Sequence, residues 1–173
     1  MAGISVRKHS ESKSESVAAD VAAKYKGEAA AEVAQWLAYA AARIVDKDAG
    51  EKIAQCLSAD EVIRAVNRYE GEAAVEIARG LSYAAANFKD KDAVEKVAQC
   101  LSADEVIRAV GKYEGYVAAE VARELAGDAL VLKDKDAMER IVQIMGRYEG
   151  HAAVAVAQEL TGVARVLKDK DAV

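Results

Sequence analysis

The chain has 173 residues, of which 53% are hydrophobic and 31% charged, and it contains 39 alanines and no proline. Because alanine loses no side-chain entropy in a helix and proline breaks one, this composition argues against all-β and disordered chains and predicts an all-α protein. Two cysteines are too few for a disulfide-stapled scaffold. The net charge of −5 arises from interspersed charges, whereas general nucleic-acid affinity needs clustered lysine and arginine.

Residues 1–16 are the first predicted region. They contain serine and lysine without helical periodicity, so we expect a flexible arm that precedes a single helical domain at 17–173. No apolar run of signal-peptide type follows Met1. No later stretch approaches the roughly 20 apolar residues that span a bilayer. The sequence therefore predicts a cytoplasmic protein with no membrane partner.

Internal repetition is the strongest feature of the remaining chain. A Tyr-x-Gly motif begins at Tyr25, Tyr69, Tyr113 and Tyr148, at steps of 44, 44 and 35 residues. The motif Asp-Lys-Asp-Ala keeps the same steps and begins at Asp46, Asp90, Asp134 and Asp169. Residues 25–68 and 69–112 share 31 identities over 44 positions. Such periods are typical of units that bury apolar faces on their neighbours, here 25–68, 69–112, 113–147 and 148–173.

Each unit is predicted to begin with a long helix after its glycine. In the second unit, Ile77, Leu81 and Phe88 lie on one apolar stripe of a 3.6-residue period, and Asp128 interrupts the corresponding stripe of the third unit. The expected helices cover 28–45, 72–89, 116–133 and 151–168. We expect the glycines to end the preceding helix in the left-handed conformation; they are Gly27, Gly71, Gly115 and Gly150. The tyrosine of each corner is expected to pack its ring against the next helix, with its hydroxyl at the surface.

A second helix is predicted in the first three units, where an aspartate precedes a glutamate by three residues. Asp48, Asp92 and Asp136 are the expected N-caps. The expected inward stripes include Cys56 in unit one, and Ile144 and Met145 in unit three.

A short third helix is predicted in units one and two. Capping patterns begin at Ser58 and Ser102, and the helices are expected to end near Gly71 and Gly115. A continuous helix through Ser102 is the alternative. Unit three lacks this element, which explains its shorter 35-residue step.

The unit length, the glycine corners and the helical pattern of residues 17–173 resemble those of armadillo and HEAT-like α-solenoids. The resemblance rests on period and helix pattern rather than on a sequence motif, and the short third helix and missing prolines depart from the family. It implies a short right-handed superhelix of three to four repeats, whose stacked faces bind other proteins.

Candidate partner-binding residues lie on the face of the long helices opposite the apolar stripe. Tyrosine and arginine combine apolar area with hydrogen-bonding tips, as protein interfaces require. The candidates are Gln35, Trp36, Tyr39, Arg43, Arg79, Tyr83, Asn87 and Arg123. The structural alternatives are an ordinary solvated helix face and, for Trp36, an end-capping role.

No catalytic, metal or cofactor site is predicted. Nearly every polar group is repeated, as structural parts are, and phosphate loops, nucleophile elbows and Cys-x-x-Cys pairs are missing. Asp46, Asp48 and Glu51 supply too few oxygen ligands for a calcium loop. Cys56 and Cys100 lie one repeat apart, about 10 Å, which is too far for a disulfide.

The sequence thus predicts a non-enzymatic interaction or scaffolding protein with a protein or peptide partner. An enzyme with a pocket inside the superhelix is a remote alternative. The runner-up is a nucleic-acid-associated repeat protein that would use Arg7, Lys8, Arg64, Arg79, Arg108 and Arg123.

The C-terminal end of the chain predicts self-association. The sequence stops at Val173, where a second helix is due, so the apolar stripe of the fourth long helix needs a cover. That stripe consists of Val156, Leu160, Val163 and Leu167. Either the stripe packs back on the preceding helix pair only, or a second subunit covers it in a twofold homodimer through this end, which is the favoured solution.

Overall fold

A computed structural model describes residues 16–43 and 47–171, apart from the side chains of residues 42, 43, 47, 161 and 164–171. Within these ranges the chain forms helices joined by turns, and it contains no strand, which confirms the predicted all-α class. None of the described helices is long and apolar enough to cross a membrane. Residues 1–15, which include most of the predicted arm with Arg7 and Lys8, lie outside the described residues.

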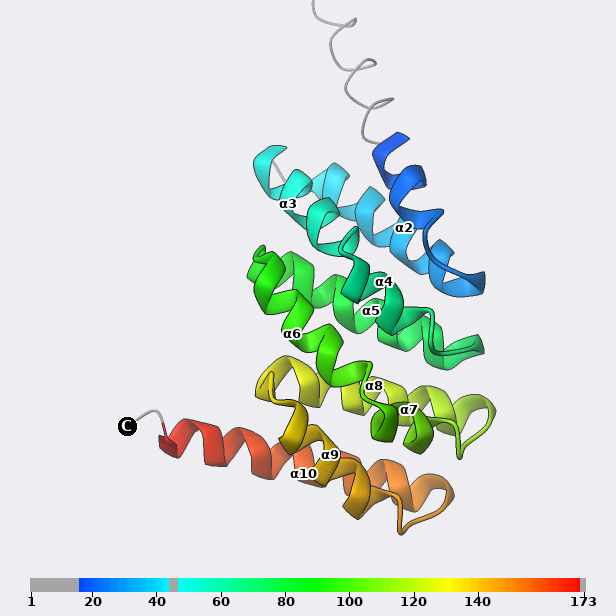
Figure 1. The fold of residues 1–173 in the computed structure, drawn as a ribbon, viewed down its shortest axis with the longest axis vertical. Coiled ribbons are helices and arrows are strands. Elements are labelled where there is room, and N and C mark those ends of the chain that lie inside the picture. Colours follow the sequence, from blue (N-terminus) through cyan, green and yellow to red (C-terminus); the bar gives the residue numbers. More distant parts are fainter. Residues whose placement is uncertain (1–15, 44–46, 172–173) are drawn as a thin grey trace, which may run out of the picture.

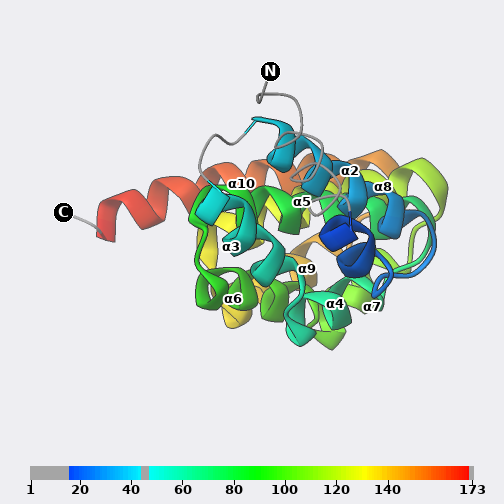
Figure 2. The ribbon, with the colours of Figure 1, turned by 90° about the horizontal axis from the view of Figure 1, so that it is seen from above.

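Four long helices lie side by side in chain order along the longest axis of the molecule (Figure 1). They are α2 (Gly27–Arg43), α5 (Gly71–Phe88), α8 (Gly115–Leu132) and α10 (Gly150–Asp171). Each begins one residue before its predicted start. Helix α10 continues three residues past its predicted end and projects beyond the other helices (Figure 2).

Shorter helices form a second layer against one side of the long ones (Figure 2). The second helices of the first three units are α3 (Lys47–Leu57), α6 (Lys91–Leu101) and α9 (Lys135–Met145). The third helices are α4 (Asp60–Val66) and α7 (Asp104–Val110), and they pack on α6 and α9, the second helices of the following units. A helical segment at 16–22 precedes α2.

The core lies between the two layers, where the predicted apolar stripes meet. Ile77, Leu81 and Leu125 are fully buried, and one continuous cluster of apolar side chains extends from Val21 to Ala157. Cys56 and Cys100 are free thiols buried in this cluster, as their inward positions predict.

The four repeated glycines do adopt the left-handed conformation, with φ of 56° at Gly27 and Gly71, 52° at Gly115 and 53° at Gly150. Their predicted role at the end of the preceding helix is wrong, because each glycine opens a long helix. The third helices likewise end earlier than expected, at Val66 and Val110. A short turn separates each of these ends from the following glycine, so the corner spans several residues.

In α6 and α9 the predicted N-caps, Asp92 and Asp136, are two residues too late, and the residue before α3 lies outside the described residues. In α6 the carboxylate of Asp90 accepts a hydrogen bond from the backbone N–H of Asp92 at 3.1 Å. In α9 the carboxylate of Asp134 accepts from Asp136 at 2.9 Å and from Ala137 at 3.2 Å. The glutamates predicted to complete the capping boxes instead pair with Lys91 and Lys135, one turn earlier in the same helices.

The short third helices exist, but serine does not cap them. Their N-caps are the extended residues Ala59 and Ala103, which make no side-chain cap. The Ser58 hydroxyl donates back to the carbonyl of Ala54 at 2.6 Å, so it belongs to the preceding helix. The extended backbone at Ala103, with ψ of 137°, rules out the continuous helix through Ser102.

Two of the four corner tyrosines do not place their hydroxyls at the surface as predicted, whereas Tyr148 is 45% exposed and the Tyr113 hydroxyl donates at an exposed position to the carbonyl of Tyr148 at 3.0 Å. Tyr25 and Tyr69 are buried, and their hydroxyls donate to the backbone carbonyls of Leu57 and Leu101 at the ends of α3 and α6. A buried hydroxyl needs such a partner, because leaving it unpaired would cost the lost hydration. Each of these two tyrosines therefore joins the corner that begins its unit to the last turn of the second helix in the same unit.

The C-terminal end of the molecule is more open than its centre. Ile144 of α9, predicted to face inward, is 41% exposed, and Val163 of α10 is 53% exposed. The prediction for Ile144 is wrong because no second-layer helix follows α9 among the described residues. Val156 and Leu160 are half-buried, as the open stripe predicts, and the side chain of Leu167 lies outside the described residues.

Candidate functional site

The candidate site is the outer face of the long helices, defined as the surface of α2, α5 and α8 that points away from the second layer. Residues at equal positions of these helices come to lie side by side because the helices pack in chain order. The outer face carries Glu32, Gln35, Trp36 and Tyr39 on α2, Glu76, Arg79, Tyr83 and Asn87 on α5, and Glu120, Arg123 and Glu124 on α8.

Aromatic side chains occupy the part of the outer face formed by α2 and α5. Tyr39 is 51% exposed and Tyr83 is 53% exposed, at the same position of the two helices. Trp36 meets Tyr39 edge-to-face, with ring centroids 6.1 Å apart, and its indole N–H donates to Glu32 at 3.0 Å. Trp36 is thereby held in one orientation, half-buried beside an exposed ring.

Arg79 is the charged centre of this part of the outer face. Its Nε donates to Glu32 of the neighbouring helix at 3.0 Å, and one terminal nitrogen donates to Glu76 at 2.7 Å. The hydrogen bond to Glu32 raises the pKa of the Arg79 guanidinium, so this group stays charged. The guanidinium is fixed by two carboxylates, with about half of its side chain exposed.

The α8 part of the outer face repeats this pairing with different partners. Arg123 lies 3.3 Å from Glu120 and 3.2 Å from Glu124. Glu124 also accepts from Gln158 of α10 at 3.3 Å, so a hydrogen bond joins these two helices.

A hollow of about 260 Å³ opens at the N-terminal ends of these helices. It is lined by Glu28, Glu72, Val75, Glu76, Tyr116, Ala119, Glu120 and Arg123. The Tyr116 hydroxyl donates to Glu120 at 2.7 Å, and the lining carries more acidic than basic groups.

Seven of the eight predicted binding residues have described side chains, and they lie on the outer face. Gln35, Arg79 and Arg123 are exposed between the helices, and Asn87 is exposed but donates to the backbone carbonyl of Tyr83 at 2.8 Å. The side chain of Arg43 lies outside the described residues.

The carboxylates that fix the arginines were not among the predicted binding residues. Glu32, Glu76 and Glu120 recur at the 44-residue step, so the repeat contained the signal that would have found them. Glu76 and Glu120 each pair with the arginine one turn later in the same helix. Glu32 instead pairs with Arg79 of the next long helix, because the two helices pack side by side.

No group of three or more histidine, cysteine, aspartate or glutamate residues in the described parts of the chain could hold a metal ion. Burial raises the pKa of the Cys100 thiol to about 11, and burial followed by the charge of Asp90 raises that of Cys56. Such thiols are poor ligands and nucleophiles near neutral pH, because the thiolate is the reactive form.

Comparisons place no known protein beside this chain. No family model matches it, and neither a curated protein nor a solved structure is similar to it. Its function is therefore inferred from the geometry of the outer face alone.

Proposed function

We propose that the chain is a short right-handed α-solenoid that acts as a non-enzymatic module, binding a protein or peptide segment across the outer face. The observation that carries this proposal is the pair of exposed tyrosines, Tyr39 and Tyr83, at equal positions on neighbouring helices. A partner segment that crosses the helices would meet both rings in succession. The predicted cytoplasmic location belongs to the same proposal.

The chemistry around the two rings supports protein recognition. Tyrosine, tryptophan and arginine supply most hot spots of protein interfaces, because they bury large areas while keeping a hydrogen-bonding tip. Trp36 and Arg79 lie beside the tyrosines, and each is already oriented by Glu32. Side chains held in place before binding lose less conformational entropy when a partner arrives.

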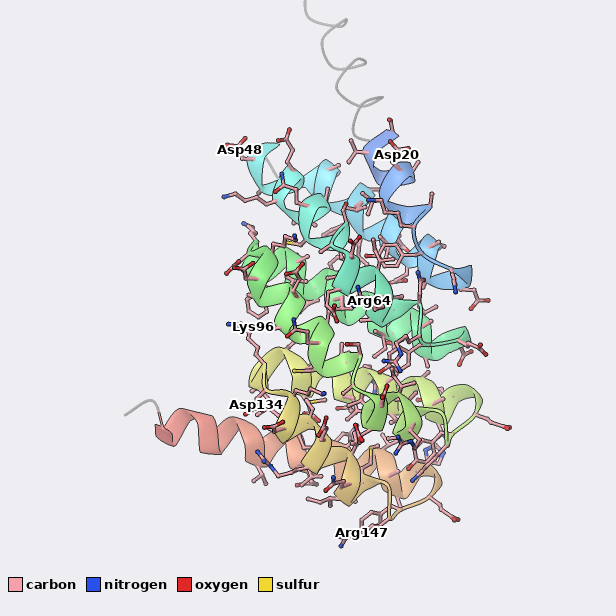
Figure 3. The ribbon with its side chains drawn as sticks, viewed as in Figure 1. Asp20, Asp48, Arg64, Lys96, Asp134 and Arg147 are labelled. Carbon is pink, nitrogen blue, oxygen red and sulfur yellow. The ribbon has the colours of Figure 1, made fainter. Side chains whose placement is uncertain are left out.

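The nucleic-acid alternative finds less support in the same residues. Arg64 pairs with Glu61 at 2.9 Å, and Arg79 and Arg123 each contact two carboxylates, so these cations are already neutralised. Figure 3 labels Arg64 and Lys96 apart from each other near the middle of the molecule and Arg147 at its lower end, with Asp134 between Lys96 and Arg147 and Asp48 at the top. Strong phosphate binding requires clustered positive charge.

The test compares the wild-type chain with the double variant Tyr39→Ala/Tyr83→Ala as immobilised bait in a cell extract, with captured proteins quantified by mass spectrometry. Tyr148→Ala is the matched control, since Tyr148 is 45% exposed but lies in the turn after α9, away from the outer face. Captured partners are then purified and titrated. Loss of a tyrosine hot spot weakens binding by about 30-fold.

Proteins retained by the wild type and by Tyr148→Ala, but lost from the double variant, would support the outer face as the binding surface. An unchanged set of captured proteins for all three baits would refute it. A titration with duplex and single-stranded DNA at two salt concentrations is the parallel experiment, because phosphate contacts weaken steeply with salt. Salt-sensitive affinity in that titration would favour the alternative.

A further inference from the structure

The first long helix, α2, leaves one apolar face open. Ala31, Ala38 and Ala41 are exposed, and Ala30 and Ala34 are half-buried. The equivalents of Ala38 and Ala34 in the following long helices are buried: Ser82 is 1% exposed, Ala126 is 2% exposed, and Ala157 is fully buried. Only α2 lacks a preceding long helix among the described residues. We call this side of each long helix its leading face, because it meets the helix before it.

The last long helix, α10, leaves the opposite face open. Val163 and Ala152 are exposed, and Val156 is half-buried. The equivalents of Val163 in the earlier helices, Ala40, Ala84 and Asp128, are 6%, 0% and 0% exposed. We call this side the trailing face, because in α2, α5 and α8 it meets the helix after it.

The four long helices form a row, and at each contact between two of them the trailing face of one helix packs on the leading face of the next. The junction of α5 and α8 shows how closely the two fit: a Cβ added to Gly80 would lie 2.6 Å from the Cβ of Ala126. The two open faces of the molecule are therefore the two halves of a contact that the fold already makes at α2/α5, α5/α8 and α8/α10.

The polar residues at the edges of the open faces are also complementary. At the α8/α10 junction, Glu124 accepts a hydrogen bond from Gln158 at 3.3 Å. The equivalent of Glu124 at the open end of α10 is Glu159, and the equivalent of Gln158 on α2 is Gln35. Both Glu159 and Gln35 are exposed. Joining the two open faces would repeat the same glutamate–glutamine pair.

The two open faces also lack the charged pair that joins neighbouring long helices inside the row. Inside the row, Glu32 pairs with Arg79 across the α2/α5 junction. At the open end of α10, Ala155 stands where the first three long helices have this glutamate, and at the open face of α2, Gln35 stands where α5 and α8 have arginine. The glutamate and its arginine partner are thus both replaced by neutral residues, so a junction between the two ends would bury no unpaired charge from this pair.

We propose that the chain associates head to tail with a second copy of itself, the trailing face of α10 packing on the leading face of α2 in the next copy. Such a contact is heterologous: each added copy again presents one open face, so the assembly grows instead of stopping at two. The outer face would continue across the copies. This self-association goes beyond the proposed recognition of a partner segment and does not depend on it.

Two exposed substitutions block the two faces separately. Ala38→Arg places a charged side chain on the leading face of α2, and Val163→Arg does so on the trailing face of α10; each position is exposed in the single chain, so the fold should tolerate the change. Gln55→Arg, at an exposed position of α3 outside both faces, is the matched control. Sedimentation equilibrium measures the mass of each protein as its concentration rises, and circular dichroism verifies that each remains helical.

We expect the mass of the wild type and of Gln55→Arg to rise steadily with concentration, and each blocked variant alone to remain a monomer. An equimolar mixture of Ala38→Arg and Val163→Arg should form a one-to-one dimer and nothing larger, because one intact face remains on each. A wild type that stays monomeric at its highest soluble concentration would overturn the proposal. So would a twofold dimer through the C-terminal end, in which Ala38→Arg alone still dimerises and the mixture contains no mixed dimer.

A gain of affinity provides a second readout that damage to the fold cannot imitate. Gln35→Arg restores on α2 the arginine found in α5 and α8, and in the proposed junction it faces Glu159 of the next copy. A new exposed ion pair should tighten association by up to about fivefold. Adding Glu159→Arg to this variant should reverse the gain, and an association constant unaffected by both changes would contradict the head-to-tail arrangement.

Discussion

Helix α5 at the centre of the row and helix α10 at its end carry the same apolar pattern in different surroundings. Leu81 of α5 is fully buried, whereas its equivalent in α10, Leu160, is half-buried. One helical turn later in each helix, at equivalent positions, Ala84 of α5 is fully buried and Val163 of α10 is 53% exposed. The periodicity of a helix therefore fixes which residues share a face, and the neighbouring helices decide whether that face is covered.

The comparison also separates two kinds of repeated position within the chain, those between neighbouring long helices and those on the outer face. One position between neighbouring long helices, that of Ala38, Ser82, Ala126 and Thr161, holds only small residues, and the helices approach closely there, since a Cβ added to Gly80 would lie 2.6 Å from the Cβ of Ala126. Positions on the outer face vary between tyrosine at 39 and 83 and glycine at 127 and 162. Substitutions at equal positions of different helices can test this difference directly.

The largest effect is expected from truncating the central leucine. Leu81→Ala removes a fully buried side chain and leaves a cavity, which should lower the free energy of unfolding by about 3 kcal/mol. Leu160→Ala removes the equivalent, half-buried side chain and should cost about 1 kcal/mol, since the exposed part of leucine gains little from burial. Urea denaturation measures both values, and equal losses would show that α10 is as well covered as α5.

Thiol reactivity should differ almost as strongly between centre and end. Cys100 of α6 is buried with a pKa of about 11, whereas Ile144 occupies its equivalent position in α9 and is 41% exposed. A thiol introduced by Ile144→Cys should have an ordinary pKa, near 8.5, and should be alkylated at pH 8 at least about 100-fold faster than Cys100. Peptide mapping after timed alkylation of the native chain separates the sites. Comparable rates at Cys100 and at the new thiol would contradict the difference in burial.

Sequence periodicity predicted most of the fold because burial in a repeat follows a regular pattern. The starts of the long helices agree within one residue, since the apolar stripe and the repeated glycine both mark them. The caps were harder to place, because either aspartate of Asp-Lys-Asp-Ala could serve. In α6 the first aspartate, Asp90, takes that role, and the following glutamate pairs with Lys91.

The errors at Ile144 and the corner tyrosines share one physical cause. Both depend on a contact between separate elements that periodicity within a helix does not encode: Tyr69 reaches Leu101 of α6, 32 residues away in the same unit, and Ile144 lacks the neighbour that covers Cys100. The outer face was predictable as a surface opposite the stripe. Its ion pairs were not, since they depend on the register between adjacent helices, as for Arg79 and Glu32.

Smaller changes in the free energy of unfolding are expected when two helical glycines are replaced by alanine, and the two changes should have opposite signs. Gly80→Ala would force its Cβ to 2.6 Å from Ala126, so α5 and α8 must separate, at a cost of about 1–3 kcal/mol. Gly127 lies in open space on α8, and Gly127→Ala should stabilise the chain by about 0.5–1 kcal/mol because alanine favours the helix. Thermal unfolding of both variants gives the signs. Stabilisation by Gly80→Ala would mean that the two helices do not approach so closely.

The smallest effect concerns how the long helices end. Lys89 and Lys133 follow α5 and α8 in the left-handed conformation, with φ of 49° and 51°, which costs a side-chain-bearing residue about 1 kcal/mol. Lys89→Gly should recover about 0.5–1 kcal/mol of unfolding free energy, because glycine adopts this conformation without strain. Lys133→Gly should gain less, since the Lys133 ammonium lies 3.7 Å from the centre of the Phe88 ring and that attraction would be lost. Introducing Lys133→Gly into a Phe88→Leu background removes the ring, so there its gain should approach that of Lys89→Gly; an unchanged gain would show that the ring contact contributes nothing to stability.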